Sequence, residues 1–578
     1  MSVEINDFSI TYTWRAKTLP YDSLKNVDLK IKKGEIFGIL GPTGAGKSSL
    51  LLCLNAIVPR LIPAVVKGDI VVDGLSTSTN QVHDMAQHIG LVLPDPSYGV
   101  VSITVEDDIA FGPSNLSLTP EEIRNRVEFA LQACRLSGYE QRSTGDLSGG
   151  ESQSLAIAGV ISMMPPVIAL DEPITMLDPI GKDRVLEVIK EINKNYNTTI
   201  IITEAGGDIE YFAPILDRVA IIKGGEILGV GAPKKVFMDE DLMGKIPDVL
   251  PPQVTRFLLD LEPGEAPPLT VAEAEDRLKR LYKSKKIQVK EPRRRRSSEK
   301  GKQEPIISIK NLHHVYPGLR EGIHALKGIS LDIYPGEYVG LIGQNGSGKT
   351  TLSYHLVGLL RPTNKDAEVI VDGVDAGKAE IKELINHINY SFQNPDSQLF
   401  QETVWGEVSY GLGLAGLSEE EIEKRGMDAL KLFKVESHRE DPIIRASLDV
   451  KRFVAISSLI ALEPKILIVD EPTNGLDYEG GKRVLDVLDT LNKSGWTIII
   501  ITHNMQLVAE YVRRVIVLKG GEVLMDGPTD EVFSQTDKLK EAFLLPPQVT
   551  QLGQRLGEIG VPDNVLSIEE MEKIINKS

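Results

Sequence analysis

The segment GEIFGILGPTGAGKSSL, residues Gly34–Leu50, recurs later in the chain as GEYVGLIGQNGSGKTTL, residues Gly336–Leu352. Each copy contains an apolar, strand-like run, then the pattern GxxxxGK followed by Ser or Thr, then a helix-like run. In that context the glycines let backbone N–H groups surround phosphate groups, and the N-terminus of the helix adds positive potential. The two segments therefore predict two α/β domains, each with a phosphate-binding P-loop.

The duplication extends beyond these loops. ALDEPITMLD, residues Ala169–Asp178, matches VDEPTNGLD, residues Val469–Asp477. LPPQVT occurs at Leu250–Thr255 and again at Leu545–Thr550, and an acidic, helix-like segment follows each occurrence (TVAEAEDRL and SIEEMEKII). We therefore expect two units of the same plan, each with a core and a C-terminal tail. The expected ranges are 1–245 and 305–540 for the two domains, 246–288 and 541–578 for their tails, and 289–304 for a charged linker.

The linker contains four consecutive arginines, Arg293–Arg296, within the charged segment Lys290–Pro305. The segment lacks apolar periodicity, so we expect it to form no core of its own. A basic run can contact anionic lipid headgroups, but such runs are common in solvated linkers, and we favour the solvated linker.

Bulk composition excludes several classes of protein. The 578 residues are 42% apolar and carry a net charge of −18, which argues against a large electrostatic contact with nucleic acid. The two cysteines, Cys53 and Cys134, cannot make a disulfide framework or an iron–sulfur site. The first ten residues show no apolar signal core, and no stretch approaches the roughly 18 apolar residues that a membrane helix needs.

The two P-loops supply the residue types that bind a nucleoside triphosphate with Mg²⁺. Lys47 and Lys349 are expected to reach the outer phosphates, and Ser48 and Thr350 to offer a hydroxyl group to Mg²⁺. The alternative is a glycine-rich turn that binds nothing, which the repeated strand–loop–helix context disfavours. The predicted nucleotide-binding residues of the loops are Gly41, Pro42, Thr43, Gly44, Ala45, Gly46, Lys47, Ser48, Ser49, Gly343, Gln344, Asn345, Gly346, Ser347, Gly348, Lys349, Thr350 and Thr351.

A tyrosine precedes each P-loop in a strand-like stretch, Tyr12 in the first copy and Tyr316 in the second. Aromatic rings stack on nucleobases, a contact worth about 1–3 kcal/mol. Either tyrosine can therefore stack on adenine, although a tyrosine that only packs against its neighbours is nearly as compatible with the sequence.

Two apolar strand-like runs end in a pair of acids, VIALDEP in the first copy and ILIVDEP in the second. Such a strand can direct a carboxylate towards a metal at its C-terminal end, where α/β sheets bind ligands. Asp171 and Asp470 suit the Mg²⁺ shell. Glu172 and Glu471 suit the attacking water, as a general base or an orienting group. An exposed acidic turn is the alternative, which the preceding P-loops disfavour.

The segment LSGGE, Leu147–Glu151, stands about twenty residues before the first acid pair. A P-loop, LSGGE and an apolar strand ending in Asp-Glu, in that order, resemble the ATP-binding cassette (ABC) family over almost the whole chain. The resemblance implies ATP hydrolysis with Mg²⁺ and, in each copy, a RecA-like core, a helical subdomain, an antiparallel β edge and a short helical tail. It also implies that ATP contacts Ser148, Gly149, Gly150 and Glu151.

A narrower resemblance is to energy-coupling factor importers and the related cobalt and nickel uptake ATPases. It rests on FQNPDSQLF (Phe392–Phe400), TVWGEVSYG (Thr403–Gly411), TVEDDIAFGPSNL (Thr104–Leu116) and the two PPQVT tails. The resemblance implies a peripheral ATPase at the cytoplasmic face of the cell membrane. Its implied partners are a separate transmembrane scaffold subunit and a small membrane protein that captures a vitamin or a metal ion, with no nucleic acid.

The copies align at a constant offset of 299 residues from Pro94 onward, and they differ at two functional positions. The resemblance implies that Gln393 reaches Mg²⁺ and water and that His503 holds the γ-phosphate, which makes both catalytic together with Glu471. Their counterparts are Pro94, which has no side-chain oxygen, and Glu204, whose carboxylate we expect to repel phosphate.

The signature motif is degenerate in the opposite copy. The first copy keeps Leu147–Glu151, whereas Ala446–Val450 of the second copy has Leu448 and Asp449 in place of both glycines. ABC domains pair head to tail, so each ATP lies between one copy's P-loop and the other copy's signature. All three departures then fall in one composite site, which we expect to bind Mg-ATP but to hydrolyse it slowly.

The main alternative is a soluble tandem ABC ATPase that acts on ribosomes or DNA. Relatives of that kind carry a cysteine-rich cluster domain, a long basic arm between the copies, or zinc modules. With two cysteines, a short linker and an acidic net charge, this chain offers none of these features. The sequence leaves open whether the copies pair within one chain or across two chains.

Overall fold

The structure, a computed structural model, describes residues 1–14, 17–18, 22–175, 177–290, 304–317 and 322–577. It divides into two compact units, residues 1–277 and 278–578. The expected linker lies largely outside the described residues, because 291–303 are not among them. The boundary between the two units falls after residue 277, within the range 246–288 that was expected for the first tail.

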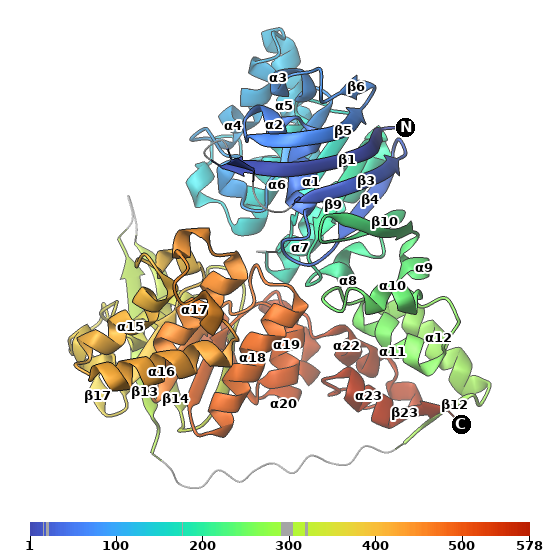
Figure 1. Ribbon diagram of the computed structural model, residues 1–578. Coiled ribbons are helices and arrows are strands. Elements are labelled where there is room, and N and C mark those ends of the chain that lie inside the picture. Colours follow the sequence, from blue (N-terminus) through green and yellow to red (C-terminus); the bar gives the residue numbers. More distant parts are fainter. Residues whose placement is uncertain (15–16, 19–21, 176, 291–303, 318–321, 578) are drawn as a thin grey trace. The chain divides into compact units, whose positions relative to one another are not determined.

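The first unit contains one large sheet and one smaller antiparallel sheet (Figure 1). The large sheet has the order β11-β10-β4-β9-β8-β7, and only the edge strand β11 runs antiparallel to its neighbour. In the smaller sheet β1 pairs with β2, β3 and β5, and β5 pairs with β6. The strands are β1 Val3–Trp14, β2 Lys17–Thr18, β3 Leu24–Ile31, β4 Ile36–Leu40, β5 Ala64–Val72, β6 Leu75–Ser76, β7 Ile89–Val92, β8 Val167–Asp171, β9 Thr199–Glu204, β10 Arg218–Lys223 and β11 Glu226–Gly231.

Both faces of the large sheet are covered, which explains why its strands read as continuous apolar runs. Alternate residues of β4 enter different cores. Ile36 and Leu40 pack in a cluster with the helices, while Phe37 and Ile39 pack in a cluster with the smaller sheet. The large sheet is therefore the middle layer of the unit, and its strand ends are held from both sides.

A group of helices forms the expected helical subdomain: α4 Val105–Ser114, α5 Pro120–Ala133 and α6 Gly149–Ile161. Thr104, Thr119 and Ser148 cap their N-termini by accepting a hydrogen bond from a backbone N–H one turn later. The following helix, α7 Pro179–Tyr196, packs against α6. The capping residues thus set where the helix bearing LSGGE begins.

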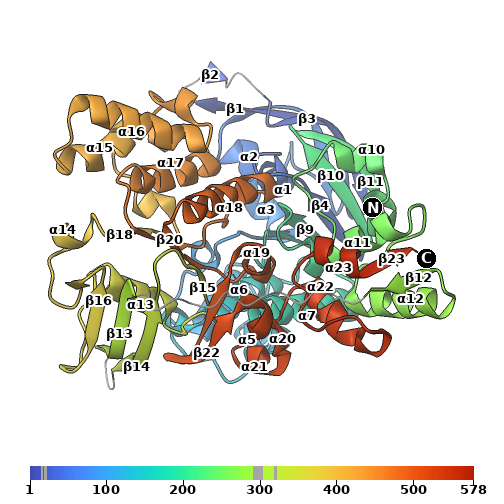
Figure 2. The same cartoon turned by 90° about the horizontal axis from the view of Figure 1, so that it is seen from below.

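The second unit repeats this plan, so the predicted duplication is confirmed. Its large sheet has the order β18-β19-β20-β15-β21-β22, which matches β7-β8-β9-β4-β10-β11, and its smaller sheet has the order β14-β13-β16-β17. The helices α15, α16 and α17 lie together, apart from β13, β14 and β16 (Figure 2). The elements are β13 Ile307–Tyr316, β14 Ile323–Ile333, β15 Tyr338–Ile342, β16 Glu368–Val371, β17 Val374–Asp375, β18 Ile388–Ser391, β19 Ile466–Asp470, β20 Thr497–Ile501, β21 Arg514–Lys519, β22 Glu522–Pro528, α15 Val404–Leu414, α16 Glu419–Leu432, α17 Leu448–Ile460 and α18 Tyr478–Lys493.

The repeated LPPQVT segments begin equivalent helix pairs. These are α11 Gln253–Leu261 with α12 Val271–Lys283, and α22 Gln548–Arg555 with α23 Ile568–Ile574, so the acidic helices expected from the sequence are present. The buried threonine of each motif donates a hydrogen bond to a carbonyl before the second helix, Thr255 to Pro268 and Thr550 to Val565, both at 2.5 Å.

A two-stranded sheet accounts for the position of the boundary between the units. Strand β12 Ile287–Val289, after the first tail, pairs antiparallel with strand β23 Ile575–Lys577, after the second tail. Residues from 278 onward therefore group with the second unit. Among the described residues, none of the helices is both long and apolar enough to cross a bilayer.

Two candidate nucleotide sites

The two P-loops occupy the predicted place, between the central strand and the next helix. The first loop joins β4 to α1 Lys47–Leu54, and the second joins β15 to α13 Lys349–Leu356. The Lys47 ammonium donates to the carbonyls of residues 41 and 42 at 2.8 and 3.1 Å, and the Lys349 ammonium donates to those of residues 343 and 344, both at 2.8 Å. Each lysine ammonium is thus held within its own loop, where it can donate to a bound phosphate in place of the carbonyls.

The second loop fits a triphosphate with Mg²⁺ in shape and in donors. A Cβ at Gly343 would lie 2.3 Å from the Leu518 carbonyl oxygen, so only glycine permits this close approach. The Ser347 hydroxyl is buried and has no hydrogen bond within the described part of the chain. Thr350 is exposed at the start of the helix, where its hydroxyl can bind a metal.

The tyrosines ahead of the loops both reach the first turn of the P-loop helix. The Tyr12 hydroxyl donates to Ser49 Oγ at 3.0 Å, and the Tyr316 hydroxyl lies 3.3 Å from Thr351 Oγ1. The Tyr316 ring also packs edge-on against His314 at 4.5 Å between centroids. Each phenol hydroxyl is therefore held by the helix that follows the P-loop, which is compatible with both the stacking and the packing interpretations.

In the second unit, the predicted base and the predicted switch histidine are in contact. The Glu471 carboxylate lies 2.7 Å from His503 Nδ1 and accepts a hydrogen bond of 3.0 Å from Thr502 Oγ1. Burial alone would raise the pKa of Glu471, but His503, Lys349 and Thr502 together lower it. The carboxylate is thus held ionised and oriented, as a group that acts on water must be.

The neighbouring acid of the same strand has a different environment. Asp470 accepts a hydrogen bond of 2.5 Å from the Tyr390 hydroxyl. Burial raises the pKa of Asp470 to about 6, which Tyr390 and Lys349 oppose. A divalent cation would supply the positive charge that stabilises the ionised form of this buried carboxyl, so Asp470 suits a metal-binding role.

In the first unit, the matching glutamate has other partners. Glu172 lies 3.6 Å from the Lys47 ammonium, across the P-loop. Burial raises the pKa of Glu172, and the attraction of Lys47 only partly offsets this effect. The pKa of Glu172 is therefore shifted upwards and that of Glu471 downwards, and the two carboxylates have different partners, although each follows the equivalent strand.

The environment of Glu204 bears on the expected repulsion between its carboxylate and phosphate. Burial, with Asp208 and Glu172 nearby, raises the pKa of the Glu204 carboxyl to about 8, so this group is mostly neutral at pH 7. Its Oε1 accepts hydrogen bonds from the N–H groups of Gly206 and Asp208 at 2.9 and 3.1 Å. Glu204 thus differs from a histidine chiefly because it is turned into its own loop and cannot supply a positive charge.

A buried ion pair beside Glu204 escaped the sequence analysis. Lys182 of α7 lies 2.5 Å from Asp208, and the two side chains are 7% and 10% exposed. The ammonium also lies 5.1 Å from the centre of the Tyr211 ring. The counterparts in the second copy are Gly481 and Leu507. A comparison of the two copies could have found the pair, because two charged residues of opposite sign replace a small and an apolar residue.

The intact signature is held at the start of α6. Ser148 and Glu151 form a reciprocal capping box, and Glu151 also accepts a hydrogen bond of 2.8 Å from the Tyr139 hydroxyl. A Cβ at Gly150 would lie 2.8 Å from the Cα of Gly181, so glycine lets α6 and α7 approach closely.

The degenerate signature lacks these features. Ser447 makes no side-chain capping hydrogen bond at the start of α17. Leu448 packs towards Gly475, and Asp449 stands at the position of Gly150. The second copy thus has bulkier side chains than the first at both glycine positions of the motif.

We predict that Lys182→Met destabilises the protein by about 3 kcal/mol, because it leaves Asp208 as a buried, unpaired charge. Urea and thermal unfolding of the full chain measure the effect. The matched control is Lys67→Met. Lys67 pairs with Asp7 at the surface, so loss of this ion pair should destabilise the protein by less than about 1 kcal/mol. The double variant Lys182→Met/Asp208→Leu should recover stability, and wild-type stability in the single variant would contradict a structural role for the pair.

Comparisons with known proteins agree with this architecture. The family model described as ABC transporter matches residues 24–175 and 326–474. A protein from Caldanaerobacter subterraneus subsp. tengcongensis that carries the name of an ABC transporter ATP-binding protein is 38% identical over 560 residues, which cover 95% of each chain. A similarly named protein from Methanosarcina acetivorans is 35% identical over 98% of this chain and 92% of its own length.

A solved structure described as CbiO1 from Clostridium perfringens, part of the ABC transporter complex CbiONQ, is 36% identical. The match covers 41% of this chain and 94% of that one, with a TM-score of 0.37. The family match to both copies and the full-length relatives are decisive. The chain belongs to the ABC transporter family and carries two of its ATP-binding domains in one polypeptide.

Proposed function

We propose that this chain is the ATP-hydrolysing subunit of a membrane importer of the energy-coupling factor type, with one competent and one degenerate ATP site. The observation that supports the asymmetry is the difference in partners: Glu471 contacts His503, whereas Glu172 lies beside Lys47. The segments Phe392–Phe400 and Thr403–Gly411 and the two PPQVT tails support the type of importer. A transmembrane scaffold subunit and a small protein that captures a vitamin or metal ion complete the proposed assembly at the cytoplasmic face.

In the proposed competent site, the second P-loop binds the phosphates and Glu471 orients the attacking water. His503 keeps Glu471 ionised before the reaction and can turn towards the γ-phosphate. Mg²⁺, held by Thr350, Asp470 and Gln393, would neutralise charge on the phosphate oxygens. The signature at Leu147–Glu151 supplies the remaining contacts from the other domain.

In the proposed degenerate site, Lys47, Ser48 and Asp171 still bind Mg-ATP. Pro94 offers no side-chain oxygen, and the neutral Glu204 makes hydrogen bonds within its own loop. ATP that stays bound there would hold the domains together while the competent site turns over. Closure and opening of the domains would drive the membrane subunits.

We expect Glu471→Gln to abolish steady-state ATP hydrolysis, because it removes the ionised carboxylate from the competent site. Glu172→Gln is the matched control at the equivalent strand end and should leave the rate nearly unchanged. Phosphate release by the purified chain measures both rates. An equal loss in the two variants would contradict the asymmetric model.

We expect His503→Ala to lower the hydrolysis rate about 100-fold, because Glu471 loses the imidazole that orients it and the γ-phosphate loses a donor. His438→Ala is the control, since His438 pairs with Asp441 at the surface. The same phosphate-release assay compares the two. A near-normal rate in His503→Ala would remove this histidine from the mechanism.

The transport role predicts that the tagged chain, isolated from solubilised membranes, copurifies with a scaffold subunit and a small membrane protein. Liposomes containing that complex should take up a vitamin or a transition-metal ion only with ATP, and Glu471→Gln should prevent uptake. If the chain instead sediments with ribosomes or DNA and binds no membrane protein, the alternative of a soluble tandem ATPase is correct.

A further inference from the structure

A buried arginine in the second unit holds the loop that carries Gln393. Arg452 of α17 is 1% exposed. One terminal nitrogen of its guanidinium donates to the Phe392 carbonyl at 2.9 Å, and the other donates to the Gln393 carbonyl. Burial lowers the pKa of Arg452 to about 10, so the group stays charged at neutral pH. Two adjacent carbonyls of the loop are thus fixed by one planar side chain.

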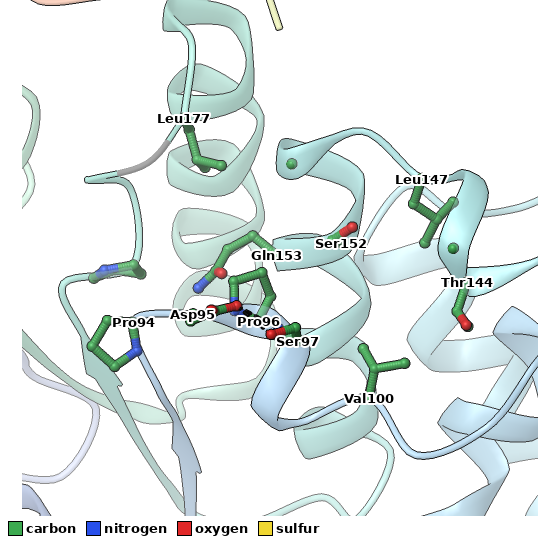
Figure 3. A pocket seen from close by; sticks show the side chains of 13 residues that line it. Pro94, Asp95, Pro96, Ser97, Val100, Thr144, Leu147, Ser152, Gln153 and Leu177 are labelled. Atoms are coloured by element: carbon green, nitrogen blue, oxygen red, sulfur yellow. Dashed lines mark hydrogen bonds between the residues drawn. The ribbon is translucent and has the colours of Figure 1, made fainter. Parts of the chain in front are cut away.

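The equivalent position in the first unit has no such contact. At the offset of 299 residues Arg452 corresponds to Gln153 of α6, which is also 1% exposed. The Gln153 amide nitrogen is buried and has no hydrogen-bond partner in the part of the chain that the structure describes. The side chain points towards the loop Pro94–Pro96 (Figure 3).

A cavity of about 430 Å³ lies between that loop and α6. Pro94, Pro96, Leu147, Gln153 and Leu177 are among the residues that line it (Figure 3). The shorter glutamine side chain carries a single NH₂ donor group in place of the guanidinium's fork, so it cannot bridge two neighbouring carbonyls as arginine does. The loop at Pro94 therefore lacks the restraint that the loop at Gln393 has.

Resting on the proposed function, we propose that Arg452 is a positioning residue for Gln393, and that Gln153 marks the loss of this restraint in the degenerate site. By fixing the backbone of Gln393, Arg452 sets where the exposed side-chain amide can point. The amide is the part expected to meet Mg²⁺ and water. Arg452 itself contacts neither of them and acts through the loop.

Each of the two signature helices departs from the other at a different place. Helix α17 begins in the degenerate motif Ala446–Val450 yet retains Arg452, whereas α6 begins in the intact motif Leu147–Glu151 yet has Gln153. In a head-to-tail pair, the first turn of such a helix serves the ATP held by the other domain. The buried residue farther along serves its own domain's loop. Each substitution therefore affects the same composite site as Pro94 and Glu204.

Arg452→Gln in the full chain gives the second unit the residue of the first. We expect the maximal hydrolysis rate to fall about 10-fold and the Mg²⁺ concentration for half-maximal rate to rise by a similar factor. The KM for ATP should change little, because the P-loop is untouched. Gln153→Ala is the matched control and should leave the rate and its Mg²⁺ dependence unchanged. Arg452→Lys, which keeps the charge but donates from a single nitrogen, should lie between the wild type and Arg452→Gln.

A double-mutant cycle with Gln393→Ala separates positioning from general structural support. If Arg452 acts through Gln393, Arg452→Gln causes no further loss in the Gln393→Ala background. Additive losses, or wild-type Mg²⁺ dependence in both Arg452 variants, would overturn the inference. An unaffected Gln393→Ala variant would instead contradict the proposed competent site, so the two failures are distinguishable.

Discussion

The contact between Glu471 and His503 is the interaction on which the proposed functional asymmetry of this chain depends. A carboxylate buried at the end of a strand would otherwise hold a proton, and a protonated glutamic acid cannot polarise water. His503 and Thr502 keep it ionised and directed. In the first unit the same strand end carries Glu172, which lies 3.6 Å from the Lys47 ammonium and whose pKa burial raises, and the neighbouring strand ends in Glu204 in place of a histidine.

The rest of each unit can be understood as support for that strand end. Both faces of the large sheet are packed, so the strands bearing the acids are fixed within the middle layer. In the second unit, Arg452 donates to the loop that carries Gln393, and Tyr390 donates to Asp470. In the first unit the buried ion pair of Lys182 and Asp208 lies beside Glu204. The duplication thus preserves the scaffold in both copies, while the set of residues proposed for hydrolysis is complete in one.

Local patterns in the sequence were sufficient to predict much of this structure. Strands β4 and β15 directly precede the P-loops as predicted, and both tails form the expected helices. Contacts between distant residues could not be predicted in this way. Arg452 reaches carbonyls about sixty residues earlier in the chain, and the neutral state of Glu204 arises from burial among other acids. The position of the boundary between the units depends on pairing of β12 with β23, which are two short segments without a distinctive pattern.

The central claim is that the two sites bind ATP alike but differ in chemistry. It is tested most directly by counting nucleotides in one turnover. The full chain, loaded with radiolabelled Mg-ATP and freed of excess nucleotide, is quenched over time and its bound ATP and ADP are separated. The account predicts two ATP molecules per chain, of which one is converted to ADP while the other is recovered as ATP. Conversion of both molecules at the same rate would contradict it.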